Sequence, residues 1–321
     1  VKKRRDCSGK EGKYFNFTKS FTLINEDCDI VTEDGMQLIC FRKNVIPKKC
    51  SDAAYKNLLD ASTKSSNRGA AAGPLNPKHF GASRAKRLSR FNNSVYRGKI
   101  TLPNGTVSNT SVSNPVHSGI VGYMDSTPRL PCRMTRYTRD EFEKYKKAIP
   151  YIEQVNKQFK KTTPKKYAAQ LKKAKKTGTQ IGNTAYSTIT VNKNFRTGLH
   201  KDKGDDPEGF GNLTVVGKGE YKGGYTMFPE YYIAVDVKTG DYLGMNVHEY
   251  HCNSKITGKG TRMSCVCYYR TKLNKCPKGI FKKLEKDIIK YTKEKQKNKN
   301  SAKTKALRKK LTIKGGGWLK N

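Results

Sequence analysis

The stretch YYIAVDVKTGDYLGMNV, residues 231–247, holds two short segments rich in β-branched and aromatic residues, separated by a Gly-Asp pair typical of a turn. Segments of the same kind lie on both sides of it. They are AYSTITV (185–191), NLTVV (212–216) and RMSCVCYYR (262–270). Short strands at this spacing, separated by Gly or Asp turns, are typical of a compact antiparallel barrel or sandwich. We therefore predict an antiparallel β-core over about residues 183–270.

Helices are expected upstream of this core. One helix is predicted from Arg139 to about Lys161, with Thr138 as its N-cap and a kink or break at Pro150. A second, strongly basic helix, PKKYAAQLKKAKK, begins at Pro164, a residue favoured at the first helical position.

Four further segments complete the outline of the chain. QLICF (37–41) predicts a strand, and the Ser-, Gly-, Ala- and Pro-rich residues 61–76 predict an irregular loop. Residues 81–130 combine turns with short alternating strands. After Cys276 a lysine-dense segment has the pattern of a helical tail.

The charge of the chain is unusual. Lys and Arg number 66 against 26 Asp and Glu, which gives a formal net charge of +40 at pH 7, and hydrophobic residues make up 35%. Such a surplus indicates an anionic partner, nucleic acid first, because clustered Lys and Arg release counterions from phosphates. The alternative is a solvated, lysine-rich surface. No run of about 18 apolar residues occurs, and VKKRRDC leads into no apolar segment, so neither a membrane span nor a signal peptide is expected.

The chain has nine cysteines. Cys265 and Cys267 alternate with apolar residues, as buried thiols on a strand do. Four earlier cysteines lack the close C-x-x-C spacing of a zinc site, and no such site is expected there. They are Cys7, Cys28, Cys40 and Cys50. We expect reduced, intracellular thiols.

The stretch TGLHKDKGDD (197–206) contains a candidate metal site. His200 and Asp202 are two residues apart, so on an extended segment both side chains point to the same face. The next histidines, His248 and His251, lie in NVHEYHCNSKI, and either could supply a third ligand. The alternative is ordinary polar surface without a metal.

Two His and one carboxylate bind one face of Fe(II) and leave three positions open, of which a 2-oxo acid can take two and dioxygen the third. In TRMS, Arg262 and Ser264 are also two residues apart on an expected strand. Arg262 can pair with the far carboxylate of 2-oxoglutarate, and Ser264 can donate a hydrogen bond to it.

Four ordered stretches carry a resemblance to a known family. They are residues 183–210, 223–243, 246–256 and 261–270. They resemble the TET/JBP family of 2-oxoglutarate- and Fe(II)-dependent dioxygenases, which oxidise the methyl group of 5-methylcytosine or thymine in DNA. Upstream, SNRGAAAG and PCRMTRYT resemble motifs of its fungal, algal and viral branches.

The resemblance implies an α+β fold with a double-stranded β-helix core, jelly-roll and cupin-like, flanked by helices. It implies a dioxygenase domain over residues 61–275, between an N-terminal segment (1–60) and a lysine-rich helical tail (276–321). It also implies that the distal iron ligand is the His of an H-x-N sequence, here His251. His248, three residues earlier on the expected strand, would face the opposite side.

Asp205 stands three residues after Asp202, where members of the TET branch carry an Asn that contacts the target base. An ionised Asp only accepts hydrogen bonds, so it favours the amino group of 5-methylcytosine over O4 of thymine, although it can also accept from thymine N3–H. Two alternatives stay open. Asp206 could act instead, or Asp205 could cap a turn.

Three arginines in the upstream motifs are candidates for contacts with DNA or cosubstrate, with a solvated surface role as the alternative. They are Arg68, Arg133 and Arg136. The basic helices and the tail are expected to supply phosphate contacts.

The function expected from the sequence is oxidation of 5-methylcytosine in DNA to 5-hydroxymethylcytosine and further products, with Fe(II) and 2-oxoglutarate. The target base must flip out of double-stranded DNA. The alternatives are thymine hydroxylation, the same chemistry on RNA or a protein side chain, and an inactive nucleic-acid-binding homologue. We expect a monomer, in the nucleus or another DNA-containing intracellular compartment.

Overall fold

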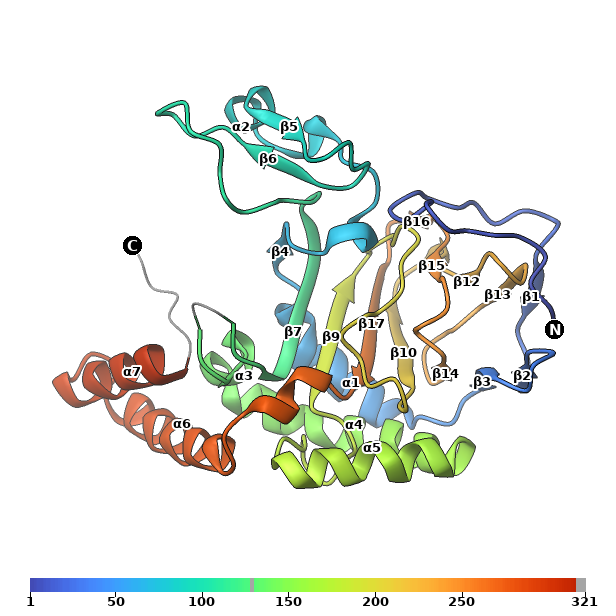
Figure 1. The fold of residues 1–321 in the computed structure, drawn as a ribbon. Helices are drawn as coiled ribbons and strands as arrows, with labels where there is room; N and C mark the ends of the chain where they lie inside the picture. The colour runs from blue at the N-terminus through green and yellow to red at the C-terminus, as the bar shows by residue number, and fades with distance from the viewer. Residues whose placement is uncertain (128–129, 316–321) are drawn as a thin grey trace.

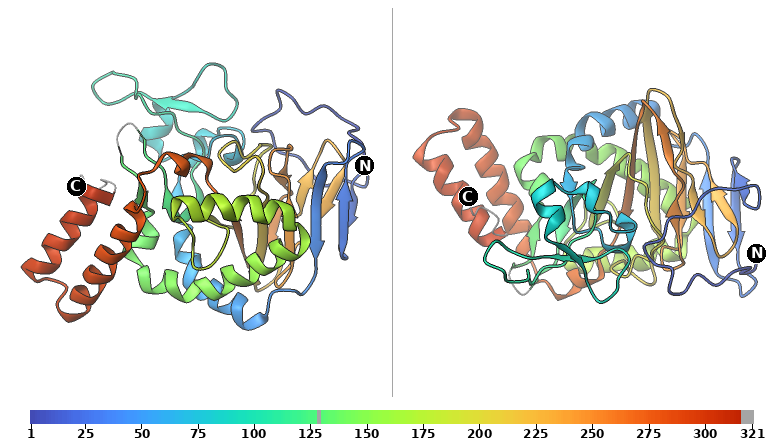
Figure 2. Two further views of the ribbon diagram at one scale, coloured as in Figure 1. Left: turned by 60° about the horizontal axis from the view of Figure 1, so that its bottom comes forward. Right: turned by 90° about the horizontal axis from the view of Figure 1, so that it is seen from above.

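The computed structural model describes residues 1–127 and 130–315 of the chain. Two β-sheets lie at its centre, with helices on the outside of the larger one (Figures 1 and 2). The order of strands in the larger sheet is β2 (Cys28–Val31), β3 (Gln37–Arg42), β14 (Tyr242–Met245), β10 (Gly211–Lys218), β17 (Thr261–Tyr268), β9 (Thr188–Lys193), β7 (Val116–Met124) and β4 (Lys64–Ser65), and β8 (Arg133–Met134) also pairs with β7. All of its pairs are antiparallel.

The smaller sheet has the order β1 (Thr22–Ile24), β13 (Ile233–Val235), β12 (Thr226–Phe228) and β15 (Cys252–Asn253). Beside β15, an antiparallel bridge joins His200 to His251, with both backbone N–H···O bonds at 3.0 Å. Two further strand pairs stand apart from these sheets. They are β11 (Tyr221–Gly223) with β16 (Ile256–Gly258), and β5 (Leu88–Arg90) with β6 (Gly98–Ile100).

The chain alternates between the two sheets. Strands β9, β10, β14 and β17 lie in the larger sheet, whereas the segment at His200 and strands β12, β13 and β15 lie in or beside the smaller one. Apolar side chains from both sheets meet between them, including Leu213 and Val215 from β10 and Phe228 and Ile233 from the smaller sheet. This arrangement is a double-stranded β-helix, and it confirms the predicted α+β jelly-roll fold.

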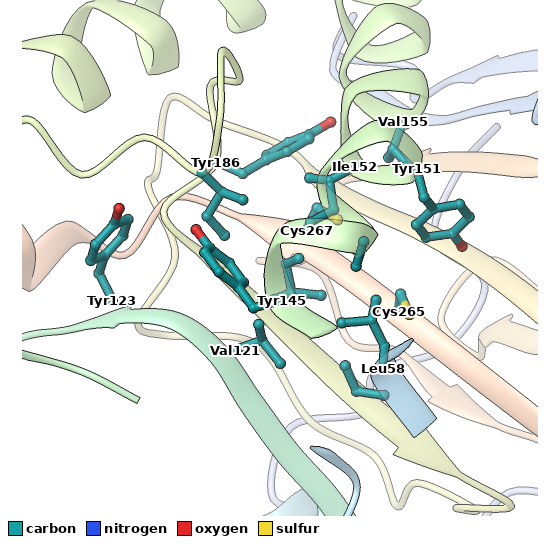
Figure 3. Packing of buried hydrophobic residues seen from close by; sticks show 14 of the residues in the cluster. Leu58, Val121, Tyr123, Tyr145, Tyr151, Ile152, Val155, Tyr186, Cys265 and Cys267 are labelled. Carbon is teal, nitrogen blue, oxygen red and sulfur yellow. The ribbon is translucent and has the colours of Figure 1, made fainter. Parts of the chain in front are cut away.

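The helices are α1 (Lys48–Leu58), α2 (Ala82–Lys86), α3 (Arg136–Asp140), α4 (Phe142–Thr162), α5 (Pro164–Thr177), α6 (Ile280–Lys297) and α7 (Ala302–Gly315). On β17, Cys265 and Cys267 point toward α4, and both are buried as predicted. Figure 3 shows them near Tyr151 and Ile152 of that helix. Because side chains alternate along a strand, Arg262 and Ser264 point to the opposite face, between the sheets.

The start of the helical region differs from the prediction. Thr135, not Thr138, is the N-cap of α3, and its hydroxyl accepts from the backbone N of Thr138 at 3.3 Å. The Thr138 hydroxyl is engaged elsewhere, because it accepts from the backbone N of Gly122 in β7 at 2.7 Å. Helix α4 then begins at Phe142.

Pro150 does not divide the helix, and α4 is continuous through it. Proline removes one helical N–H bond, but Ala148, Tyr151 and Ile152 around it are buried in the main core. Packing of this face outweighs the local cost, since tertiary contacts provide most helix stability in proteins. The second helix begins at Pro164 as predicted.

The two ends of the chain are part of the packed structure. Strands β1 and β3 extend the smaller and the larger sheet, and the buried face of α6 enters the main core. The segments outside residues 61–275 thus pack against the expected dioxygenase domain. None of the helices in the described part of the chain has the length and apolarity that a membrane crossing needs.

A disulfide joins Cys132 to Cys276, whose Cα atoms lie 5.8 Å apart. The expectation of reduced thiols throughout is wrong for this pair. The packing of α6 against β8 and α4 brings the start of the tail beside the segment before α3. These two cysteines are 144 residues apart in sequence, so no local motif could pair them.

We predict that a chain ending at Lys275 loses its cooperative fold. The deletion removes the buried Leu311 of α7 and four buried side chains of α6 from the main core, and each large-to-small core change typically costs about 2–5 kcal/mol against a total stability of about 5–15 kcal/mol. The four side chains of α6 are Phe281, Leu284, Ile288 and Tyr291. Thermal unfolding followed by circular dichroism measures the effect.

The matched control is the triple variant Lys282→Gln, Lys286→Gln and Lys290→Gln, which changes exposed positions of the same helix. It should keep an unfolding midpoint close to that of the unaltered chain, because exposed substitutions usually change stability by at most about 0.5 kcal/mol each. A truncated chain that unfolds at the original midpoint would show that α6 contributes nothing to the core.

Candidate active site and metal centre

His200, Asp202 and His251 come together between the sheets, with one ligand atom of each within 4.8 Å of the others. The Asp202 carboxylate lies between the imidazoles, 3.7 Å from Nε2 of His200 and 3.7 Å from Nε2 of His251. The backbone bridge between His200 and His251 sets this spacing, because paired residues on neighbouring strands present their side chains side by side. The cluster has the size and the donor set of a metal site.

Both imidazoles are oriented by backbone carbonyls. Nδ1 of His200 donates to the carbonyl of Gly198 at 2.8 Å, and Nδ1 of His251 donates to that of Glu249 at 2.9 Å. A carbonyl can only accept, so Nδ1 carries the proton and Nε2 presents a lone pair to Asp202. Burial and, to a smaller extent, the neighbouring His200 lower the pKa of His251 to about 4, so this side chain is neutral at pH 7. Metal-binding histidines are typically held in this way.

His248 lies outside the cluster. It sits in a turn rather than on a strand, and its Nε2 lies 3.3 Å from the backbone oxygen of Asp206. The premise that His248 and His251 share a strand is therefore wrong, but the structure places His251, and not His248, beside His200 and Asp202.

Arg262 is a buried cation on the inner face of β17. Its side chain is almost fully buried, and its Nε and Nη2 have no hydrogen-bond partner among residues 1–127 and 130–315. Burial lowers the pKa of its guanidinium. A buried unpaired charge is costly, so such a group indicates a site for an anion. Ser264, also buried, points to the same face two residues later.

Gly224 makes room for this cation. A Cβ there would lie 2.8 Å from both Cδ and Nε of Arg262, and the glycine has a positive φ of 76° that side-chain residues rarely adopt. The donor set of His200, Asp202 and His251 suits Fe(II), and the unpartnered guanidinium suits a carboxylate. These residues therefore fit iron and the dicarboxylate 2-oxoglutarate.

Asp205 is buried beside the cluster. Burial raises the pKa of its carboxyl well above the ordinary value, and the Asp202 carboxylate raises it further. Its Oδ2 has no hydrogen-bond partner in the described part of the chain. The raised pKa favours the neutral carboxyl over the ionised one assumed from the sequence, and a neutral carboxyl donates one hydrogen bond and accepts others.

Asp206 has a different environment. Its Oδ1 is paired with Nζ of Lys173 at 2.6 Å and accepts from the backbone N of Glu208 at 3.3 Å. Asp206 thus closes the turn that follows, and its Oδ2, like Oδ2 of Asp205, has no hydrogen-bond partner in the described part of the chain.

The three upstream arginines occupy different places. Arg68 has a buried Nε without a partner among the described residues, and the charge of Asp202 acts on its pKa, which burial lowers. Arg133 donates from Nη1 to the backbone oxygen of Asp125 at 2.7 Å. The Arg136 side chain is 88% exposed. Of these three arginines, only Arg68 lies beside the cluster of His200, Asp202 and His251 with a buried donor that has no partner among the described residues. Arg136 lies on the surface.

Sequence reasoning missed two residues near Asp205, namely Arg270 and Tyr268. Arg270 is ion-paired with Asp125, and its backbone pairs with that of Asp205. The buried Tyr268 lies close enough for its pKa to respond to the charges of Asp205 and Arg270. The alternation in RMSCVCYYR could have found Tyr268 and Arg270, because they continue the face of Arg262 and Ser264.

Residues 118–271 match the family model Tet_JBP, described as the oxygenase domain of the 2OGFeDO superfamily. The thymine dioxygenase JBP1 of Trypanosoma brucei brucei is 34% identical over 169 residues, which cover 50% of this chain and 20% of that protein. The bifunctional helicase and thymine dioxygenase JBP2 of Leishmania tarentolae is 34% identical over 165 residues, covering 50% and 15%. The chain thus corresponds to about a fifth or less of the length of these curated relatives.

Among solved structures, NgTET1 in complex with 5mC DNA aligns with a TM-score of 0.49 and 16% identity, covering 80% of this chain and 84% of that one. The double-stranded β-helix, the matched model and the His–Asp–His cluster place the central domain in the 2-oxoglutarate- and Fe(II)-dependent oxygenase superfamily. Within it, residues 118–271 are an oxygenase domain of the Tet_JBP family, which confirms the resemblance seen in the sequence.

Proposed function

We propose that this chain is a 2-oxoglutarate- and Fe(II)-dependent dioxygenase that oxidises the C5 methyl group of a pyrimidine base in DNA. The observation that carries the proposal is the unpartnered, buried Arg262 within the same jelly roll as the cluster of His200, Asp202 and His251. A metal-ligand set and a separate buried cation together match a cosubstrate that chelates iron at one end and carries a carboxylate at the other.

Each residue has a defined part in this proposal. His200, Asp202 and His251 would hold the iron, and Arg262 would bind the far carboxylate of 2-oxoglutarate with a hydrogen bond from Ser264. With dioxygen, the bound iron and cosubstrate supply an oxidant strong enough to remove hydrogen from a methyl group. The protein would exclude bulk water from these groups, since Arg262 and His251 are both buried.

Two bases are candidates for the substrate. The sequence favoured 5-methylcytosine, and the curated relatives named above are thymine dioxygenases. Asp205 in its neutral form, which its raised pKa favours, would suit both, because it would donate to N3 and accept from the amino group of cytosine, or donate to O4 and accept from N3–H of thymine. The target base must leave the duplex to reach the site, since the methyl carbon of a stacked base cannot enter it.

Succinate release tests the proposed class of reaction. We expect Fe(II)-dependent succinate formation that increases when duplex DNA containing a C5-methylated pyrimidine is added. A rate that DNA does not change, but that RNA or a protein extract increases, would favour the alternative substrates. Absence of succinate under all conditions, in a chain that still binds DNA, would identify an inactive homologue. We further propose that the chain acts as a monomer in a DNA-containing compartment such as the nucleus.

Asp205 is expected to bind the base through both carboxyl oxygens. We predict that Asp205→Asn keeps much of the base oxidation, since an amide also offers a donor and an acceptor, whereas Asp205→Ala loses about tenfold or more. A good bidentate contact to a base is worth about 1–3 kcal/mol. Both variants should retain 2-oxoglutarate decarboxylation in the absence of DNA. Equal loss in the two variants, together with loss of DNA-free decarboxylation, would show that Asp205 supports the iron site instead.

A further inference from the structure

Residues 74–115 form a small lobe outside the two sheets, here called the basic lobe (Figure 1, above β7). It comprises α2 and the β5–β6 pair and has an apolar core of its own. The buried residues of that core are Leu75, Phe80, Ile100 and Val112. The lobe lies before the first residue matched by the family model.

Asn114 joins the two ends of the basic lobe. Its buried side chain donates to the backbone oxygens of Ala72 at 3.0 Å and Pro74 at 2.6 Å, and its Oδ1 accepts from the backbone N of Asn76 at 2.9 Å. The lobe is therefore a fixed element and not a loose loop, since both of its connections meet at one satisfied amide.

The basic lobe carries only positive charge. It contains seven Lys and Arg, and no Asp or Glu occurs anywhere from residue 61 to residue 124. Five of these cations are exposed, namely Lys78, Arg84, Lys86, Arg90 and Arg97. No carboxylate in the described ranges is ion-paired with a cation of the lobe, so its charge is available to a partner.

Some of these cations are held by aromatic rings instead. Arg84 lies over the ring of Phe80, and Lys99 lies over that of Phe91 at 4.6 Å from its centre. A ring positions a cation without neutralising it. The lobe thus presents oriented positive charges, which suits a polyanion.

A tight turn at residues 101–107 gives the lobe an apolar tip. The backbone N of Leu102 donates to the oxygen of Thr106 at 2.7 Å, and the N of Gly105 donates to the oxygen of Leu102 at 2.9 Å. Leu102 is 42% exposed and Val107 is 54% exposed, among the most exposed large apolar side chains in the described part of the chain. Apolar side chains at the end of a basic element are the means by which several proteins enter and unstack a duplex.

The base of the lobe adjoins the candidate metal centre. The backbone N of Gly198, two residues before His200, donates to the oxygen of Ala71 at 2.9 Å, next to the residue that Asn114 binds. The charge of Asp202 also acts on Arg68, just upstream. A duplex bound to the basic lobe would therefore lie close to the cluster.

We infer that the basic lobe binds the phosphates of duplex DNA and that its tip, Leu102 with Val107, enters the base stack where the target base leaves it. The inference rests on the proposed function and identifies the surface that extracts the base. Extraction breaks stacking and pairing at a cost of a few kcal/mol, and an inserted apolar wedge offsets that cost. The lobe supplies charge for affinity and the tip supplies the wedge.

Two variants of the full chain separate these parts. Lys86→Gln with Arg90→Gln removes two exposed charges of the lobe, and Leu102→Ser with Val107→Ser removes the apolar tip. The matched controls are Lys49→Gln with Lys56→Gln, on exposed positions of α1, and Val31→Ser with Ile289→Ser, at exposed apolar positions elsewhere. DNA binding is measured by fluorescence anisotropy at several salt concentrations, with a duplex that carries 2-aminopurine next to the methylated base.

The charge variant should lower the slope of log affinity against log salt by about 1.8, since each phosphate contact contributes about 0.9. The tip variant should keep that slope, lose the 2-aminopurine signal of unstacking, and oxidise duplex DNA on the order of tenfold more slowly while single-stranded DNA is oxidised at the original rate. The controls should change none of these measurements.

An unchanged salt slope in the charge variant would overturn the role of the lobe in DNA binding. The same conclusion would follow if the α1 control lost as much DNA affinity as the charge variant. An equal loss of duplex and single-strand oxidation in the tip variant overturns the wedge. Binding and 2-aminopurine fluorescence need no turnover. If the chain oxidises no DNA base but the lobe variants still change these signals, the proposed function fails and the inference about the lobe stands.

Discussion

The variant His251→Ala should lose Fe(II) binding and turnover together, whereas His248→Ala should keep most of both. His251 presents Nε2 to Asp202 within the cluster, and His248 is turned toward a backbone oxygen outside it. Changes to residues that merely support a metal ligand typically cost about 10–100-fold in affinity or activity, so removal of a ligand should cost at least about 100-fold. Titration of the apoprotein with Fe(II) by calorimetry, followed by succinate release, measures both effects.

His200→Ala and Asp202→Ala should behave as His251→Ala does, because all three supply one ligand atom to the same centre. His248→Ala is the matched control, since it removes the same side chain three residues away. An active His251→Ala variant alongside an inactive His248→Ala variant would show that the ligand assignment is wrong.

Arg262→Ala should raise the Michaelis constant for 2-oxoglutarate steeply and leave DNA affinity nearly unchanged. The substitution leaves a carboxylate inside the jelly roll without a cation, and truncating one partner of a buried, hydrogen-bonded charge pair costs about 2–5 kcal/mol. At 1.4 kcal/mol per factor of ten, this corresponds to roughly 30-fold to 4,000-fold. Steady-state succinate formation at varied 2-oxoglutarate, with anisotropy for DNA, separates the two quantities.

Arg262→Lys is the conservative control. It keeps the charge but loses the planar pair of donors, so its effect should lie between those of Arg262→Ala and the unaltered chain. If Arg262→Ala weakens DNA binding and leaves the Michaelis constant for 2-oxoglutarate unchanged, Arg262 belongs to the DNA surface and not to the cosubstrate site.

Local patterns predicted the core strands and the shared face of His200 and Asp202, whereas the choice of His251 over His248 came from the family resemblance. Alternation of apolar residues predicted strand β17, and the same alternation placed Arg262 and Ser264 on the face opposite to Cys265. The spacing of His200 and Asp202 predicted side chains on one face, and the structure brings these two together with His251. Such features depend on neighbours within a few residues.

Features that depend on distant contacts were not predictable from the sequence. The Thr138 hydroxyl accepts a hydrogen bond from the backbone N of Gly122, which lies 16 positions earlier in another element. The disulfide partners Cys132 and Cys276 meet only after α6 packs. The raised pKa of Asp205 follows first from its burial, which has no signature in the residues around it, and then from the nearby Asp202.

Mass spectrometry of nucleosides tests the proposed function most directly. Duplex DNA containing thymine and 5-methylcytosine is incubated with the chain, Fe(II), 2-oxoglutarate and oxygen, and then digested. We predict a 5-hydroxymethylpyrimidine nucleoside that accumulates with succinate and is absent with His251→Ala. Unmodified nucleosides from a chain that binds iron, 2-oxoglutarate and DNA and forms succinate would contradict the assignment of a pyrimidine methyl group in DNA as the substrate.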